Sequence, residues 1–77
     1  MEQIIQQLAD YIKNTYKAEL GRQENIFNSG IIDSLGFVNL IEFIREQFGI
    51  IFEPEDLTEE NFESFERIAA FILEKNE

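Results

Sequence analysis

Ser34 is the residue of this sequence that is best placed to do chemistry. It follows Asp33 and precedes an apolar pattern of helical spacing, so the sequence predicts Ser34 on the first turn of a helix with Asp33 as its N-cap. The first N–H groups of a helix lack backbone partners and lie at the positive end of the helix dipole, which favours a phosphate group attached there. Gly36 indicates a close approach by another group, because glycine costs up to about 1 kcal/mol relative to alanine in a helix.

A serine nucleophile would need a base to accept its proton. The chain has no His and no Cys, and its lysines, Lys13, Lys17 and Lys75, are expected on solvated faces. A small hydrolase is therefore the weaker alternative, and it would lose its activity on Ser34→Ala. The many carboxylates of so acidic a surface are expected to serve solubility, so we assign no catalytic pair and expect that the chain is not an enzyme.

A cluster of acidic residues precedes the C-terminal part of the chain: Glu53, Glu55, Asp56, Glu59, Glu60 and Glu63. Their spacing does not match an EF-hand loop, which needs oxygen ligands at alternate positions, a central Gly and a final bidentate Glu. We interpret the cluster as a charged solvated face and predict no specific metal site.

Two long helices are predicted to flank the segment that leads to Ser34. Helical spacing of apolar residues runs from Gln3 to about Tyr16, with Gly21 placed to end that helix, and again over residues 34–48, with Gly49 as the stop. The second pattern consists of Leu35, Val38, Leu40, Ile41, Ile44 and Phe48. Residues 18–33 have no sustained period and indicate a long loop held by Ile26, Phe27, Ile31 and Ile32.

The C-terminal part is predicted to add one short and one long helix. Residues 50–52 precede Pro54 and have no partner strand, so they are expected to form a buried loop. Thr58 is expected to cap a short helix over residues 59–62, and Ser64 a last helix with the apolar stripe Phe65, Ile68, Ala69 and Ile72. The predicted fold is all-α, a small four-helix bundle with three longer helices and one short helix, in a single domain over residues 1–77.

The net charge of −10, from 16 acidic and 6 basic residues, bounds the possible partners. It repels nucleic acid and anionic lipid and favours a partner with a basic surface. The N-terminal residues Met1-Glu2-Gln3-Ile4-Ile5 lack the features of a signal peptide, and no stretch approaches the roughly 18 apolar residues of a membrane span. We expect a cytoplasmic monomer with no nucleic acid partner.

The sequence resembles the phosphopantetheine-dependent carrier proteins, which include acyl, peptidyl and D-alanyl carriers. The mark of that family is a serine in an Asp-Ser-Leu or similar motif at the start of the second of four helices. Here the motif is Asp33-Ser34-Leu35. The resemblance covers nearly the whole chain, through residues 27–36, 48–50, Pro54, residues 56–62 and residues 68–70.

The resemblance implies that Ser34 carries a covalent 4′-phosphopantetheine from coenzyme A, with Asp33 and Leu35 as its motif neighbours. The thiol of this arm would hold an acyl or aminoacyl group as a thioester. A magnesium-dependent phosphopantetheinyl transferase would attach the arm, and an acyl- or amino-acid-activating ligase and downstream biosynthetic enzymes would use it. Partners of this family dock on the second helix, whose solvent-facing candidates here are Gly36, Val38, Asn39, Glu42, Arg45 and Glu46.

This face is less acidic than that of the fatty-acid carriers, since Gly36, Asn39 and Arg45 stand where acids are typical. Gly36 resembles the free-standing carriers that work with dedicated ligases. The alternative from another class is an unmodified acidic helical adaptor that binds a basic partner. Such an adaptor would keep its activity after Ser34→Ala.

Overall fold

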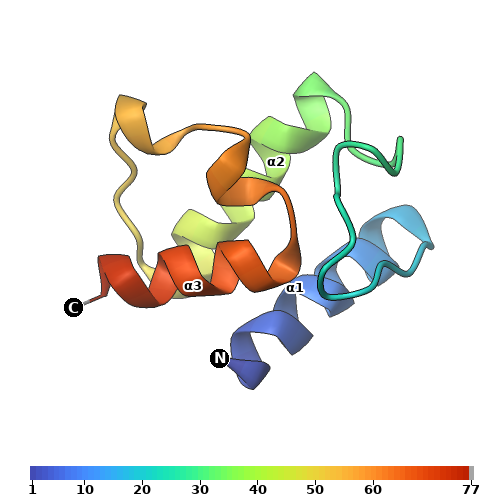
Figure 1. Cartoon of the computed structure of the whole chain (residues 1–77), viewed down its shortest axis with the longest axis horizontal. Coiled ribbons are helices and arrows are strands. Elements are labelled where there is room, and N and C mark those ends of the chain that lie inside the picture. The colour runs from blue at the N-terminus through green and yellow to red at the C-terminus, as the bar shows by residue number, and fades with distance from the viewer. Residues whose placement is uncertain (77) are drawn as a thin grey trace.

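A computed structural model describes residues 1–76 of the chain, and all its regular structure is helical. The α-helices are α1 (Glu2–Tyr16), α2 (Ser34–Phe48) and α3 (Phe65–Lys75), with the 3-10 helices η1 (Pro54–Asp56) and η2 (Glu60–Phe62) between α2 and α3. In Figure 1, α2 runs behind α3, and the long loop from α1 to α2 lies on the right. Within residues 1–76, no helix is long and apolar enough to cross a membrane. The predicted all-α class is confirmed.

Helix α1 ends earlier than its predicted stop at Gly21. Lys17 adopts the left-handed conformation at φ 57°, and its N–H donates to the Lys13 carbonyl at 2.9 Å. Gly21 lies in the following loop, where its N–H donates to Glu24 Oε1 at 3.0 Å. A left-handed residue is a common helix terminator even though it is usually glycine, and pattern reasoning had no signal that Lys17 would take this role.

Helix α2 has the predicted bounds, because both of its ends carry local capping signals. The Asp33 carboxylate accepts a hydrogen bond from the Gly36 N–H at 2.7 Å at the N-terminus. At the C-terminus Gly49 is left-handed at φ 67°, and its N–H donates to the Arg45 carbonyl at 3.0 Å. These caps fix where the helix begins, and therefore the position of Ser34 on its first turn.

The short helix predicted over residues 59–62 is the 3-10 helix η2, and a second 3-10 helix, η1, precedes it. The structure has three α-helices among the described residues, so the predicted count of four helices is not confirmed. Two hydrogen bonds join Glu53 and Asp56 across η1. The Glu53 N–H donates to Asp56 Oδ2 at 2.9 Å, and the Asp56 N–H donates to the Glu53 carbonyl at 2.9 Å. Thr58 caps the next turn as expected, accepting from the Asn61 N–H at 3.3 Å. Each of these helices has only three residues, and such short turns with hydrogen bonds between residues i and i+3 are typical of 3-10 rather than α-helices.

Helix α3 begins as predicted. The Ser64 hydroxyl is buried and accepts a hydrogen bond from the Arg67 N–H at 3.1 Å. The predicted apolar stripe is buried along the helix: Phe65, Ile68, Ala69 and Ile72.

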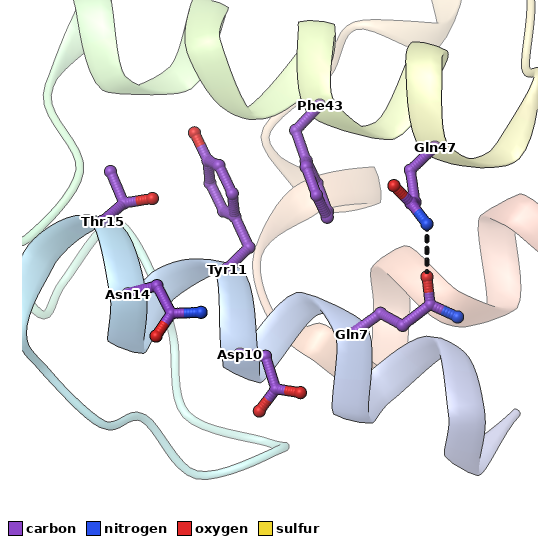
Figure 2. A pocket seen from close by; sticks show the side chains of 7 residues that line it. All are labelled: Gln7, Asp10, Tyr11, Asn14, Thr15, Phe43 and Gln47. Atoms are coloured by element: carbon purple, nitrogen blue, oxygen red, sulfur yellow. Dashed lines mark hydrogen bonds between the residues drawn. The ribbon is translucent and has the colours of Figure 1, made fainter.

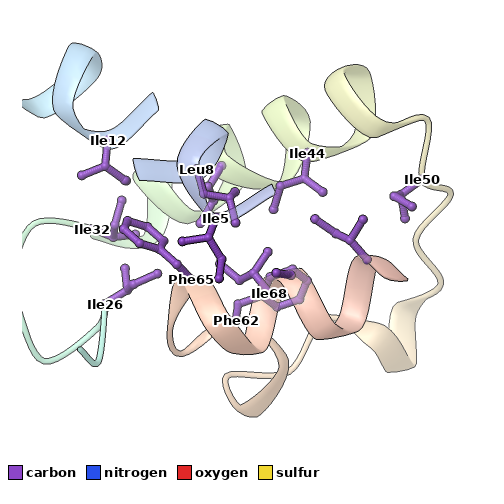
Figure 3. Packing of buried hydrophobic residues seen from close by; sticks show 13 residues of the cluster. Ile5, Leu8, Ile12, Ile26, Ile32, Ile44, Ile50, Phe62, Phe65 and Ile68 are labelled. Atoms are coloured by element: carbon purple, nitrogen blue, oxygen red, sulfur yellow. The ribbon is translucent and has the colours of Figure 1, made fainter. Parts of the chain in front are cut away.

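The core brings all three α-helices and the loops together (Figure 3). It consists of Ile5, Leu8, Ile12, Ile26, Ile32, Leu40, Ile44, Ile50, Phe62, Phe65, Ile68, Ala69 and Ile72. Leu35, from the predicted apolar pattern, and Ile51, from the predicted buried loop, are exposed by 69% and 82%, whereas Val38, which was also predicted to face solvent, is exposed by 56%. The apolar pattern identified the helix but not all of its buried side, and the predicted buried loop over residues 50–52 buries Ile50 while exposing Ile51.

The loop between α1 and α2 is fixed to the start of α3. The Ile26 N–H donates to the Glu63 carbonyl at 2.7 Å, and the Glu66 N–H donates to the Arg22 carbonyl at 3.0 Å. Ile26 is fully buried, and Ile32 nearly so. The sequence prediction that apolar residues hold this loop is therefore confirmed, and the loop is as firmly placed as the helices.

A seam of side chains joins α1 to α2 on the side drawn in Figure 2. Tyr11 and Phe43 stack with ring centroids 4.3 Å apart, and the Gln47 side-chain amide donates to Gln7 Oε1 at 3.1 Å. The hollow beside them has a volume of about 290 Å³. None of the site residues predicted from the sequence lines it, so we interpret it as part of the helix contact.

Candidate functional site

Ser34 lies at the first position of α2, at a corner where the long loop meets the helix. The side chains of Asp33, Ser34 and Leu35 are all exposed there. The predicted motif residues are thus together on one accessible turn. The Leu35 side chain is 69% exposed and is therefore available to contact a bound molecule.

The backbone around Ser34 offers donors to an anion. Asp33 occupies two of the donors of the first turn, since its carboxylate accepts from Gly36 N–H and its carbonyl accepts from Phe37 N–H at 2.8 Å. Within residues 1–76, the N–H groups of Ser34 and Leu35 donate to no other residue. These two N–H groups and the helix dipole favour a phosphate on the Ser34 hydroxyl.

An apolar groove of about 590 Å³ opens beside the Ser34 hydroxyl. It is lined by Phe27, Ile32, Asp33, Ser34, Phe37 and Val38. Phe37 joins the groove to the interior, because its ring lies 5.6 Å from that of Phe27 and 5.4 Å from that of the buried Phe62. A chain attached to Ser34 would therefore find apolar surface next to its point of attachment.

The sequence prediction placed Gly36 on the solvent-facing side of the helix, and this prediction is wrong. Gly36 is buried, and an alanine methyl group there would lie 2.8 Å from the Tyr16 hydroxyl oxygen and 3.2 Å from Asp33 Oδ1. The close approach that a glycine indicates is therefore present inside the molecule, and it comes from α1.

The other predicted partner residues are exposed along α2: Val38, Asn39, Glu42, Arg45 and Glu46. Arg45 and Glu42 form an ion pair at 2.7 Å. Hydrogen bonding to Arg45 lowers the pKa of Glu42, and the same bond raises the pKa of Arg45. The two charges offset each other, so this stretch of α2 presents a nearly neutral surface with one apolar residue, Val38, at its edge.

Among residues 1–76, no lysine lines the groove beside Ser34. Lys13 and Lys17 are exposed on and after α1, and the third lysine is not the solvated residue expected from the sequence. Lys75 pairs with Asp56 at 2.6 Å and lies 5.9 Å from the ring centroid of Phe71. Its partner comes from a distant segment, which helical pattern reasoning does not detect.

Most of the acidic cluster is a solvated face, as predicted, since Glu53, Glu55, Glu59 and Glu60 are exposed. Two members of the cluster contact basic side chains. Asp56 binds Lys75 and Glu60 lies 3.9 Å from Arg67. Across the part of the chain that the structure describes, no group of three or more acidic residues is arranged to hold a metal ion.

The sequence places Phe37 and Val38 as apolar neighbours of the Ser34 hydroxyl, and both line the groove. Sequence reasoning missed Tyr16, which reaches the first turn of α2 from the end of α1. Glycine at position 36 was the available signal for this contact, but it did not identify the residue that makes it.

Comparison with known proteins shows the family to which the chain belongs. The sequence profile of a family described as "Phosphopantetheine attachment site" matches residues 2–72. A D-alanyl carrier protein of Abiotrophia defectiva is 26% identical over 73 residues, which cover 91% of this chain and 92% of that protein.

Proposed function

Because the chain belongs to the phosphopantetheine attachment family, whose carrier proteins are not catalysts, we propose that Ser34 is the residue that bears its arm. The protein is a carrier with covalently attached 4′-phosphopantetheine, and the thiol of this group holds biosynthetic intermediates as thioesters. The observation that carries the assignment to Ser34 is its exposed position on the first turn of α2, beside two N–H groups without partners and an apolar groove.

Each residue of the turn has a role in this proposal. The Ser34 hydroxyl oxygen forms a phosphodiester with the phosphate of the pantetheine arm, which comes from coenzyme A. Asp33 holds the turn through its bond to Gly36 N–H, and Leu35 offers apolar contact to the arm or to the transferase. Among the described residues, no lysine lines the groove beside Ser34, and we propose that a separate magnesium-dependent phosphopantetheinyl transferase attaches the arm.

We propose an acyl or aminoacyl cargo that a dedicated ligase activates and loads. The name of the Abiotrophia relative, a D-alanyl carrier protein, favours an amino acid. The exposed residues of α2, Val38, Asn39, Glu42, Arg45 and Glu46, are the proposed docking face for the ligase and downstream enzymes. Because this face is nearly neutral, we propose that partner enzymes bind it through apolar and polar contacts as well as through a basic patch of their own.

For the remaining properties, we propose one carrier domain over residues 1–77, arranged like the acyl carrier proteins and acting as a cytoplasmic monomer. The net charge of −10 supports the monomeric state through mutual repulsion of copies.

The test is the intact mass of the purified chain before and after incubation with coenzyme A, magnesium and a broad-specificity phosphopantetheinyl transferase. We expect a gain of one phosphopantetheine in the wild type and in the control Ser29→Ala, and none in Ser34→Ala. A folded wild-type protein that gains no mass would contradict the proposal and favour an unmodified adaptor. Modification of Ser34→Ala would place the arm on another residue.

A further inference from the structure

The phenol of Tyr16 lies against the first turn of α2 at the one position of that turn without a side chain. An alanine methyl group at position 36 would lie 2.8 Å from Tyr16 Oη, a distance that carbon and oxygen atoms do not adopt without displacement. It would also lie 3.2 Å from Asp33 Oδ1, the atom that caps the Gly36 N–H at 2.7 Å. The Tyr16 hydroxyl and the capping carboxylate therefore both border the space beside Gly36 that a side chain would occupy.

Tyr16 is held in place from its own side. It is the last residue of α1, and the left-handed Lys17 ends the helix directly after it through the hydrogen bond to the Lys13 carbonyl. Its side chain is half-buried and packs against the hydrophobic core. The phenol is thus a fixed surface on which the start of α2 rests.

We propose that Tyr16 is a positioning residue that, through its contact with Gly36, holds the Asp33-Ser34-Leu35 turn in the geometry that modification requires. This inference rests on the proposed attachment at Ser34. The contact acts on Ser34 indirectly, because a shift of Gly36 away from Tyr16 also moves the N–H that Asp33 caps. Small displacements of a reacting group reduce rates strongly, in some cases by about 100-fold for 1 Å.

Two explanations are possible for the glycine at position 36: a partner enzyme needs the space there, or Tyr16 needs it. If the transferase or another partner needs the space at Gly36, a methyl group there harms modification whatever residue stands at position 16. If Tyr16 needs the space, removal of the phenol oxygen relieves the harm. Burial of Gly36 supports the second explanation.

The experiment is a double-mutant cycle with Gly36→Ala, Tyr16→Phe and the combined variant, read out as kcat/KM for modification by the transferase. Intact mass gives the rates, and urea unfolding gives the stability of each variant. The matched control is Gly21→Ala, because a methyl group at Gly21 would meet only Glu24 atoms at 3.9 Å. Tyr16→Phe alone supplies the reference rate for the combined variant.

We expect Gly36→Ala to reduce kcat/KM about tenfold, Gly21→Ala to leave it unchanged, and the combined variant to return to within about threefold of Tyr16→Phe. A wild-type rate for Gly36→Ala would overturn the proposal, as would a combined variant as slow as Gly36→Ala. If Gly36→Ala does not fold, the combined variant decides alone: it must fold and be modified. Absence of modification in the wild type would instead contradict the attachment at Ser34.

Discussion

Asp33 connects the stability of α2 to the chemistry of Ser34. Its carboxylate accepts the Gly36 N–H at 2.7 Å, and its carbonyl accepts the Phe37 N–H. A single residue therefore both begins the helix and sets the direction of the neighbouring hydroxyl. Asparagine caps helices about as well as aspartate, whereas alanine does not.

We expect Asp33→Ala to lower the free energy of unfolding by about 1 kcal/mol and to slow modification of Ser34, because the cap is lost. The control Asp33→Asn should keep the stability. Urea unfolding and intact-mass kinetics on the same samples measure the two effects. An Asp33→Asn variant that is stable but slowly modified would show that the charge of Asp33 matters to the transferase as well as its cap.

Single residues could be predicted from the sequence where their role depends on near neighbours. Asp33, Gly49 and Ser64 cap helices that start or end beside them, and all three were identified correctly. Gly36 and Lys75 were interpreted wrongly because their surroundings come from Tyr16 and Asp56, which are distant along the chain. No local pattern contains that information.

Helix α3 is fastened at its end to η1 by the ion pair of Lys75 and Asp56. The hydrogen bond to Lys75, together with one from the Glu53 N–H, lowers the pKa of Asp56 below its ordinary 3.8. The same bond raises the pKa of Lys75 above its ordinary 10.5. The charged forms of both residues are therefore favoured in the folded state.

The stabilisation by this pair should be full between about pH 4 and pH 10. It should be lost as the pH falls through the depressed pKa of Asp56, because the unfolded state then binds more protons, and as the pH rises through the raised pKa of Lys75. Urea unfolding of the wild type and Asp56→Asn across pH should show a difference that is constant near neutrality and vanishes in strong acid. Glu59→Gln, an exposed acid between η1 and η2, is the control. A difference that persists at pH 2 would contradict the role of the ion pair.

The helices themselves were largely predictable, because 15 consecutive residues of regular apolar spacing in α1 and α2 outweigh local ambiguity. The segment between α2 and α3 was not. Its turns depend on bonds such as Glu53 to Asp56, and on Pro54 at the first position of η1, which do not repeat with a helical period. The short helix expected over residues 59–62 is consequently a 3-10 turn, and η1 before it was not predicted.

The whole molecule concentrates a net charge of −10 within 31 × 25 × 20 Å. Among the described residues, Arg22, Arg45, Arg67 and Lys75 already pair with acids of the same chain. Such exposed pairs contribute little to stability, at most about 1 kcal/mol each. Repulsion among the remaining acids is therefore the larger electrostatic effect, and it opposes folding.

We expect the melting temperature at pH 7 to rise with salt. The Debye length is about 30 Å at 0.01 M and about 10 Å at 0.1 M, so repulsion spans the molecule only at low ionic strength. Thermal unfolding followed by circular dichroism in NaCl and in KCl measures the effect, and equal slopes identify screening. A melting temperature that falls with salt would mean that the ion pairs outweigh the repulsion.

The bonds from Ile26 to Glu63 and from Glu66 to Arg22 link the long loop to the start of α3. Opening of the loop at these residues would break both bonds and expose the buried Ile26. We therefore expect opening of this part of the loop to cost more than the fraying of a free surface loop. If the turn that carries Ser34 shares this order, the entropy of ordering it is already spent in folding and not at each encounter with an enzyme.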